Sequence, residues 1–185
     1  MTVFRKLALG GALAVPALLA LPAGATTLEA VDFKELIHAA DACVVGSVAD
    51  SRTETVDGQV YTVTDFNVSK VGFGDVGSVV SVRVPGGEVS RSMFPVSEVV
   101  PGAPRFLSGQ DYFLLLDDAQ SLQPGFAAID ATDGFVPAGV FEGALSMAGG
   151  RVNLPGLGNG LDAEEALEIV TTERAAPTAE IGETE

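Results

Sequence analysis

Three neighbouring segments of the chain alternate apolar and polar residues with the period of two that is typical of β-strands. They run from Val48 to Thr55, from Val60 to Val71 and from Ser78 to Val84, and they are rich in Val, Thr, Tyr and Phe. Asp57-Gly58 lies between the first two segments, and this dipeptide supplies the positive φ angles of a tight hairpin turn. The pattern predicts three consecutive antiparallel strands.

The alternation slips by one residue within the middle segment. Tyr61 and Val63 are apolar in one phase, whereas Phe66 and Val68 are apolar in the other. Such a slip would put half of the apolar side chains in water unless an extra residue is inserted. We therefore predict a β-bulge near Thr64-Asp65, which would bend the strand and help a short sheet to curl.

Two helices are predicted, one on each side of the strands. Asp32 is a candidate N-cap with Glu35 three residues later, and a face of Phe33, Leu36, Ile37 and Ala40 follows. The second helix opens at Asp162 with Glu165 as its capping partner, and its apolar stripe contains Ala166, Leu167 and Val170. The first helix is expected to pack on the sheet through its apolar face.

The later strands are less uniform. Asp111 to Leu116 is a continuous apolar run, which indicates a central strand buried on both faces. Weaker strands are expected at Phe126 to Ile129 and Gly134 to Val136, and another near Val140-Phe141 or Arg151 to Leu154. Gly156 to Gly160, with the sequence GLGNG, is expected to be a flexible connector.

The segment from 88 to 108 contains three prolines and no sustained period, which is typical of a functional loop or of a cover over an open barrel end. Arg91, Met93, Phe94 and Arg105 are the candidate residues of a partner-binding surface. The alternative is that Met93, Phe94 and Phe106 plug the interior of the fold.

The two ends of the chain differ from its middle. Residues 1–25 have a basic start at Arg5 and Lys6, an apolar run and the small residues Ala23-Gly24-Ala25, as in a cleaved signal peptide. A retained membrane anchor is the alternative, but the run is short for a bilayer, which needs about 20 residues. The folded domain is expected at 26–170, and 171–185 is expected to be a disordered acidic tail.

Charge and composition limit the partners. The net charge of −15 argues against nucleic acid and anionic membranes, and no stable membrane insertion is expected after signal cleavage. Solubility alone would also explain the acidity. Cys43 is the only cysteine, so an internal disulfide is excluded, and it is expected to be a small buried hydrophobe.

Catalytic patterns are sparse. One His and one Cys are too few for a zinc site of the usual kind, and no G-x-S-x-G motif is present. The DATDG stretch that ends at Gly134 resembles part of a calcium loop, but the later ligands are missing and a turn fits better. Asp117-Asp118 is the one carboxylate pair considered, although adjacent strand residues point to opposite faces. No catalytic residue, metal or cofactor is therefore assigned.

Four segments carry a family resemblance: ADACVVGSV, YTVTDFNVSKV, GDVGSVVSVRVPGGEV and PGAPRFLSGQDYFLLL. Over Leu28 to Val136 the chain resembles a family of exported bacterial proteins, some fused to secreted metalloproteases or surface modules. That family is similar to the OB-type barrel of netrin-like domains and of tissue inhibitors of metalloproteinases. The resemblance implies a mainly β, small antiparallel OB-like barrel. The inhibitors' mechanism needs an N-terminal cysteine that this chain lacks.

These observations predict an exported, non-enzymatic binding module of the periplasm or extracellular space, with a protein or glycan partner. Two alternatives stay open: an inhibitor or accessory domain of a secreted protease, and a hydrolase that uses carboxylates alone.

Overall fold

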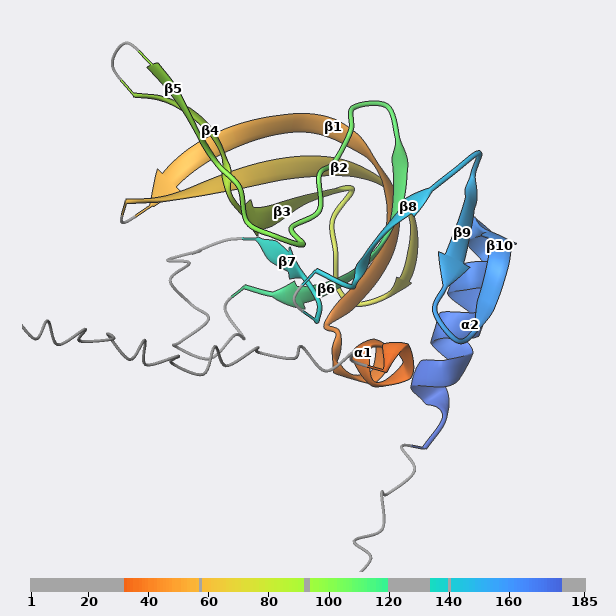
Figure 1. Cartoon of the computed structure of the whole chain (residues 1–185). Coiled ribbons are helices and arrows are strands. Elements are labelled where there is room, and N and C mark those ends of the chain that lie inside the picture. Colours follow the sequence, from red (N-terminus) through yellow and green to blue (C-terminus); the bar gives the residue numbers. More distant parts are fainter. Residues whose placement is uncertain (1–31, 57, 92–93, 120–133, 140, 178–185) are drawn as a thin grey trace, which may run out of the picture. The chain divides into compact units, whose positions relative to one another are not determined.

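A computed structural model of the chain describes residues 32–56, 58–91, 94–119, 134–139 and 141–177. They form a mainly β structure with one helix before the first strand and one after the last, as predicted (Figure 1). The helices are α1 (Phe33–Ala39) and α2 (Ala163–Ala175). The strands are β1 (Ala42–Val56), β2 (Gln59–Phe73), β3 (Val79–Pro85), β4 (Gly87–Arg91), β5 (Phe94–Glu98), β6 (Asp111–Asp118), β7 (Phe135–Pro137), β8 (Ala144–Met147), β9 (Arg151–Leu154) and β10 (Gly158–Asp162).

The largest sheet closes on itself. Its strands follow the order β1-β2-β3-β7-β6-β8, and β1 also pairs with β6, so β1, β2, β3, β7 and β6 form a ring. Every neighbouring pair in the ring is antiparallel except β3 and β7, which are parallel and meet at Val82 and Phe135. The prediction of a wholly antiparallel sheet is wrong at this pair. A parallel pair needs a long crossover between its strands, and the chain between β3 and β7 supplies it.

The three strands predicted around the Asp-Gly turn are confirmed as β1, β2 and β3, paired in sequence order. The predicted bulge has the right position along the pair but lies on the wrong strand. Val48 pairs with Phe66 and Asp50 pairs with Asp65, so the extra residue is Ala49 of β1. Thr64 occupies the interior position of β2, fully buried and hydrogen-bonded to the Ser51 hydroxyl, which accounts for the gap in the apolar pattern.

The buried side chains form two clusters on the opposite faces of β1 and β6. The interior cluster lies inside the ring and includes Val44, Phe66, Val82 and Leu114. The helix-side cluster lies between the outer face of these strands and α1, α2 and β9, and includes Cys43, Val45, Phe113 and Leu115. As predicted, β6 is buried on both faces, since Tyr112, Leu114 and Leu116 face the interior while Phe113 and Leu115 face the helices.

The helix caps follow the sequence pattern closely. The Asp32 side chain accepts a hydrogen bond from the Lys34 amide, and Phe33, Leu36, Ile37 and Ala40 are buried. At the start of α2, Asp162 and Glu165 form the predicted capping box. However, α2 continues to Ala175, so the start predicted for the tail at residue 171 is too early. Glu173 and Arg174 hold this last turn through contacts with α1.

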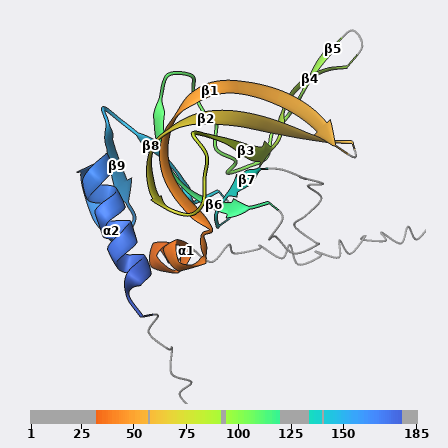
Figure 2. The same ribbon diagram turned by 180° about the vertical axis from the view of Figure 1, so that it is seen from behind.

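Two segments predicted to be irregular are paired strands. The segment from 88 to 108 begins with the β4–β5 hairpin, which stands out from the ring in both views (Figures 1 and 2). The GLGNG segment is not a free connector, because Gly158 pairs with Leu154 and Leu161 pairs with Val152 in the β9–β10 hairpin. Arg151 to Leu154 is confirmed as β9.

Several predictions fall outside the described residues. They concern the signal peptide at 1–25, the strand at Phe126 to Ile129, most of the DATDG stretch and the final residues of the tail. Within the described part of the chain, neither helix is long and apolar enough to cross a membrane.

Arg174 joins the two helices. Its Nη1 donates hydrogen bonds to the carbonyl oxygens of Ile37 (2.8 Å) and Ala40 (2.6 Å) at the C-terminal end of α1, and its guanidinium carbon lies 4.0 Å from the centre of the Phe73 ring. These carbonyl groups have no partner within α1, so Arg174 satisfies acceptors that the short helix leaves open.

We expect Arg174→Ala to lower the free energy of unfolding by about 2–3 kcal/mol, because a charged donor and a ring contact are lost together. Urea denaturation measures this change. Lys34→Ala is the control, since it removes an exposed α1–α2 ion pair with Glu173 that is worth at most about 1 kcal/mol. Equal losses in the two variants would contradict the assigned role of Arg174.

Candidate functional site

A cavity of about 380 Å³ opens where the β4–β5 hairpin leaves the ring. We call it the hairpin pocket. Thr53, Thr62 and Val84 line it from β1, β2 and β3. Residues 85–88, 97 and 98 line it at the base of the hairpin, and residues 99, 100 and 103–107 form the rest of its wall. Residues far apart in the sequence therefore converge on one opening.

Two glycines let the hairpin start close to the ring. Gly86 has a φ of +95° and Gly87 a φ of +145°, a region that residues with a Cβ rarely adopt. A Cβ on Gly87 would lie only 2.7 Å from the Thr62 hydroxyl oxygen. The same hydroxyl donates a 2.8 Å hydrogen bond to the Gly86 carbonyl oxygen, which fixes the hairpin base against β2.

Phe106 is the one aromatic residue among those that line the pocket, and we call its side chain the floor. Phe106 packs edge-on against Phe66 at 4.9 Å and against Tyr112 at 5.1 Å between ring centroids, and Phe66 and Tyr112 belong to the interior cluster. The Tyr112 hydroxyl also accepts a 2.8 Å hydrogen bond from the Leu107 amide. Phe106 thus packs against the interior cluster at this end of the ring. This is the position expected under the alternative in which Phe106 plugs the interior.

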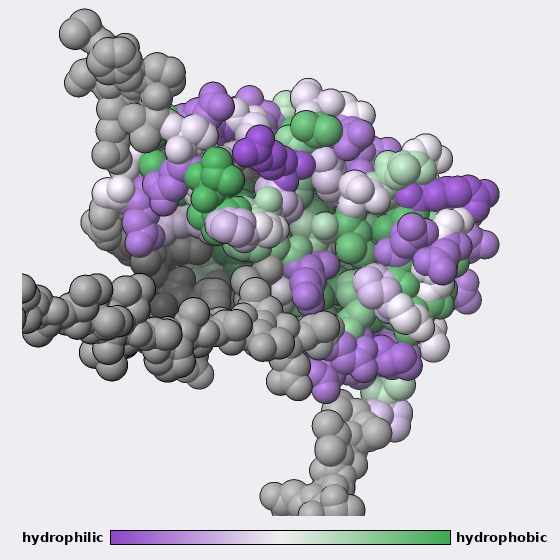
Figure 3. Space-filling model, viewed as in Figure 1, coloured by the Kyte–Doolittle hydropathy of each residue, from purple (hydrophilic) through white to green (hydrophobic). Residues whose placement is uncertain are grey.

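The rim of the pocket is apolar and solvent-exposed. Among the described residues four large hydrophobic side chains are strongly exposed, and two of them, Val99 at 64% and Leu107 at 57%, line this pocket. Figure 3 shows apolar and strongly hydrophilic side chains side by side near the base of the hairpin. An opening with an aromatic floor, an apolar rim and a few charged groups is typical of a ligand site.

The four residues predicted as a binding surface are spread over this region. Arg105 is exposed and lines the pocket. Arg91 and Phe94 pair with each other at the outer end of the β4–β5 hairpin, and Met93 lies outside the described residues. The sequence did not single out Val99, Leu107, Glu88 or Glu98. The Pro85-Gly86-Gly87 turn, which directly precedes Glu88, was the sequence feature that could have pointed to this region.

Comparison of the chain with protein-family models, curated proteins and solved structures found no match. Function therefore has to be inferred from the geometry of the site and from the chemistry of its residues.

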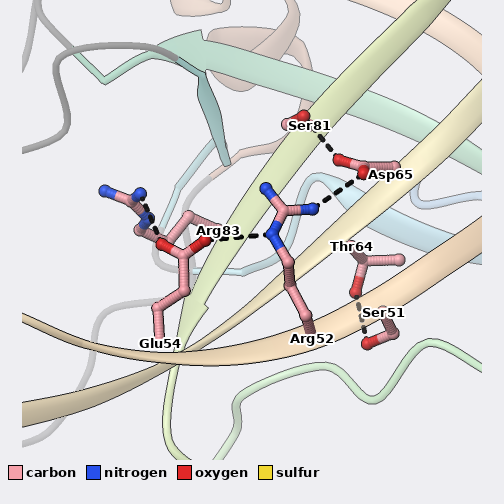
Figure 4. Close-up of polar contacts among 7 residues, drawn as sticks. All are labelled: Ser51, Arg52, Glu54, Thr64, Asp65, Ser81 and Arg83. Atoms are coloured by element: carbon pink, nitrogen blue, oxygen red, sulfur yellow. Dashed lines mark hydrogen bonds and ion pairs between the residues drawn. The ribbon is translucent and has the colours of Figure 1, made fainter.

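A charged network covers the outer face of β1, β2 and β3 (Figure 4). Arg52 contacts Glu54 at 3.0 Å and Asp65 at 2.8 Å, Glu54 also contacts Arg83 at 3.1 Å, and Ser81 donates to Asp65. The hydrogen bond that Arg52 donates to the Glu54 carboxylate is the main cause that raises the pKa of Arg52, and Asp65 adds to this effect. Both carboxylates are engaged within the network, so it serves to hold three strands together.

Arg83 is the least satisfied member of this network. Its Nε and Nη1 are buried without a hydrogen-bond partner, while the centre of the Tyr61 ring lies 6.0 Å from its guanidinium carbon. Within the part of the chain that the structure describes, its one ion pair is with Glu54. The hairpin pocket is the stronger candidate site, because an open cavity and exposed apolar groups coincide there.

Cys43 is fully buried in the helix-side cluster, as predicted. Burial raises the pKa of its thiol to about 12, although the charge of Arg174 acts in the opposite direction. The thiol therefore stays protonated at neutral pH, whereas nucleophilic attack requires the thiolate. Cys43 acts as an apolar core residue.

Asp117 and Asp118 end the buried strand β6 and pair with Val136 and Phe135 of β7. Strand alternation puts Asp117 on the face of Leu115 and Asp118 on the face of Leu116, so the two carboxylates do not form one reaction site. Burial, with a smaller effect of the Asp41 charge, raises the pKa of Asp117 to about 6. Among the described residues no group of three or more His, Cys, Asp or Glu side chains is arranged to hold a metal ion.

The raised pKa of Asp117 predicts a pH dependence of stability. The folded state binds this proton up to about pH 6, whereas the unfolded chain releases it near 3.8. Stability that is present below 3.8 is therefore lost as the pH rises to 6. Asp117→Asn cannot ionise, so its melting temperature relative to the wild type should rise by a few degrees between pH 4 and pH 7.

Differential scanning fluorimetry at both pH values measures this difference. Asp50→Asn, at an exposed position of β1, is the matched control for removal of a carboxylate. A difference between Asp117→Asn and the wild type that is the same at pH 4 and pH 7 would contradict the interpretation.

Proposed function

We propose that the protein is an exported, non-enzymatic binding module whose ligand site is the hairpin pocket. The observation that carries this proposal is the coincidence of an open 380 Å³ cavity with an aromatic floor and two exposed apolar rim residues, Val99 and Leu107. The exposure of apolar groups to water costs free energy, and this free energy is regained when a partner covers them. The signal-like residues 1–25 support export to the periplasm or beyond.

We further propose that the ring is an OB-type barrel. The support is that the ring has five strands. In chain order, the first strand, β1, closes onto the fourth, β6, and the fifth, β7, pairs between β3 and β6. OB-type barrels are five-stranded, partly open and used for ligand binding through their loops and strand faces. In this chain the binding role is assigned to the excursion between β3 and β6, and the partner is a protein or a glycan.

Paired substitutions on the rim test the proposal. We expect Val99→Ser with Leu107→Ser to weaken capture of partners from cell-envelope and culture-medium extracts of the source organism by about tenfold or more, as for truncated interface anchors. The matched control is Val71→Ser with Val79→Ser, because these residues are exposed to 48% and 51% but lie outside the pocket. A glycan array run with the same three proteins covers carbohydrate partners. Equal binding by all three proteins would eliminate the pocket as the site.

The β4–β5 hairpin supports a second candidate, an inhibitor or accessory domain of a secreted protease. The two strands pair only with each other among the described residues and project from the ring, a geometry that can enter a cleft (Figure 2).

Titration of the purified protein against a panel of secreted metalloproteases tests this second candidate. Inhibition at sub-micromolar concentration is expected from an interface of standard size. Replacement of Arg91 to Phe94 by Gly-Ser should abolish the inhibition, whereas the Glu168→Gln variant should retain it. Full protease activity at saturating protein would remove the candidate.

A further inference from the structure

We infer that the hairpin pocket receives a basic side chain, lysine or arginine, of a protein partner. The inference rests on the proposed function and adds the chemical class of the ligand. It follows from the hydrogen-bonding groups that line the pocket, from its charges and from its apolar floor.

Several backbone groups of the pocket lining are already hydrogen-bonded within the protein. The Gly86 amide donates to the Val60 carbonyl oxygen, the Ala103 amide donates to that of Val100, and the Leu107 amide donates to Tyr112. Pro85 and Pro104, which also line the pocket, have no N–H group. Carbonyl oxygens keep a second lone pair after one hydrogen bond. These carbonyl oxygens can therefore accept hydrogen bonds from the donors of a ligand.

The side-chain charges favour a cationic ligand. Glu88 and Glu98 line the pocket, both are exposed, and neither forms an ion pair within the described part of the chain. Arg105 is the single basic residue among the lining residues, so negative groups outnumber positive ones. The whole chain carries a net charge of −15, which raises the local concentration of cations around such an opening.

The apolar groups fit the stem of a basic side chain. Phe106 forms the floor, Val84 reaches the pocket from the interior cluster, and Val99 and Leu107 form the rim. Lysine and arginine bury an aliphatic stem while the charged end seeks carboxylates. A small inorganic cation would leave these apolar groups uncovered, and an acidic peptide would meet Glu88 and Glu98. A peptide side chain satisfies the apolar and the acidic parts of the pocket at once.

Amide chemical-shift titrations of the full mature chain test this assignment. The probes are Nα-acetyl-lysine methylamide, its uncharged analogue Nα-acetyl-norleucine methylamide, Nα-acetyl-glutamate methylamide, N-acetylglucosamine and putrescine. We expect the lysine probe to shift the amides of Gly86, Gly87, Glu98 and Leu107, with an affinity at least about tenfold above that of the norleucine probe, since a charge-assisted pair is added.

Three variants test where the ammonium group of the lysine probe binds. Glu88→Gln with Glu98→Gln should weaken the lysine probe about tenfold, and Glu168→Gln, an exposed glutamate on α2 outside the pocket, should leave it unchanged. Arg105→Gln should strengthen binding about two- to threefold by removing a like charge. The gain in the last variant is a result that damage to the fold would not produce.

Other outcomes overturn the inference in distinguishable ways. Preferential shifts with N-acetylglucosamine or the glutamate probe would replace the ligand class while leaving the pocket as a binding site. Putrescine binding as tightly as the lysine probe would assign a free amine in place of a peptide. Absence of shifts with every probe, or a lysine affinity unaffected by the two glutamine substitutions, would refute the basic side chain. The capture experiment with Val99→Ser and Leu107→Ser tests the proposed function independently of these titrations.

Discussion

The double pairing of β1 is the constraint on which the rest of the structure depends. Residues 42–47 of this strand pair with β6 on one edge, and nearly its whole length pairs with β2 on the other. A flat strand could not join both neighbours of a closed ring, so β1 and β2 must curve, and the three register shifts between them mark where they do. Figures 1 and 2 show both strands as long arcs.

Closure of the ring divides the apolar residues of β1 and β6 between two cores. Val44 and Leu114 face the interior, whereas Val45 and Leu115 face the helices. With no disulfide available, stability has to come from this packing. The two helices cover the outer face, and the hydrogen bonds from Arg174 to the end of α1 join the last turn of α2 to α1.

The same closure leaves one end of the ring to be covered by the chain that leaves β3. Gly86 and Gly87 allow the turn, Phe106 returns to seal the interior, and the space between them is the hairpin pocket. The pocket is therefore built from a rigid ring on one side and an irregular segment on the other. Binding sites are commonly made in this way, because loops vary freely while the scaffold holds their ends.

Local features of the fold could be predicted well from the sequence. Asp32 and Asp162 cap their helices, Asp57-Gly58 separates two paired strands, and the apolar run that ends at Leu116 is buried on both faces. Each of these features depends on residues within a few positions of one another. Local hydrogen bonds and side-chain period determine such features before any long-range contact forms.

The sequence by itself thus determined the caps, the first hairpin and the two-sided burial of β6. Only the tertiary structure decided that the bulge lies at Ala49, that β3 and β7 run parallel, and that Gly158 belongs to a strand. It alone brought Thr53, Val84 and Leu107 to one opening. The reason is physical: strand partners and pocket walls are chosen by contacts between distant residues, whose energies do not appear in the local pattern of either partner.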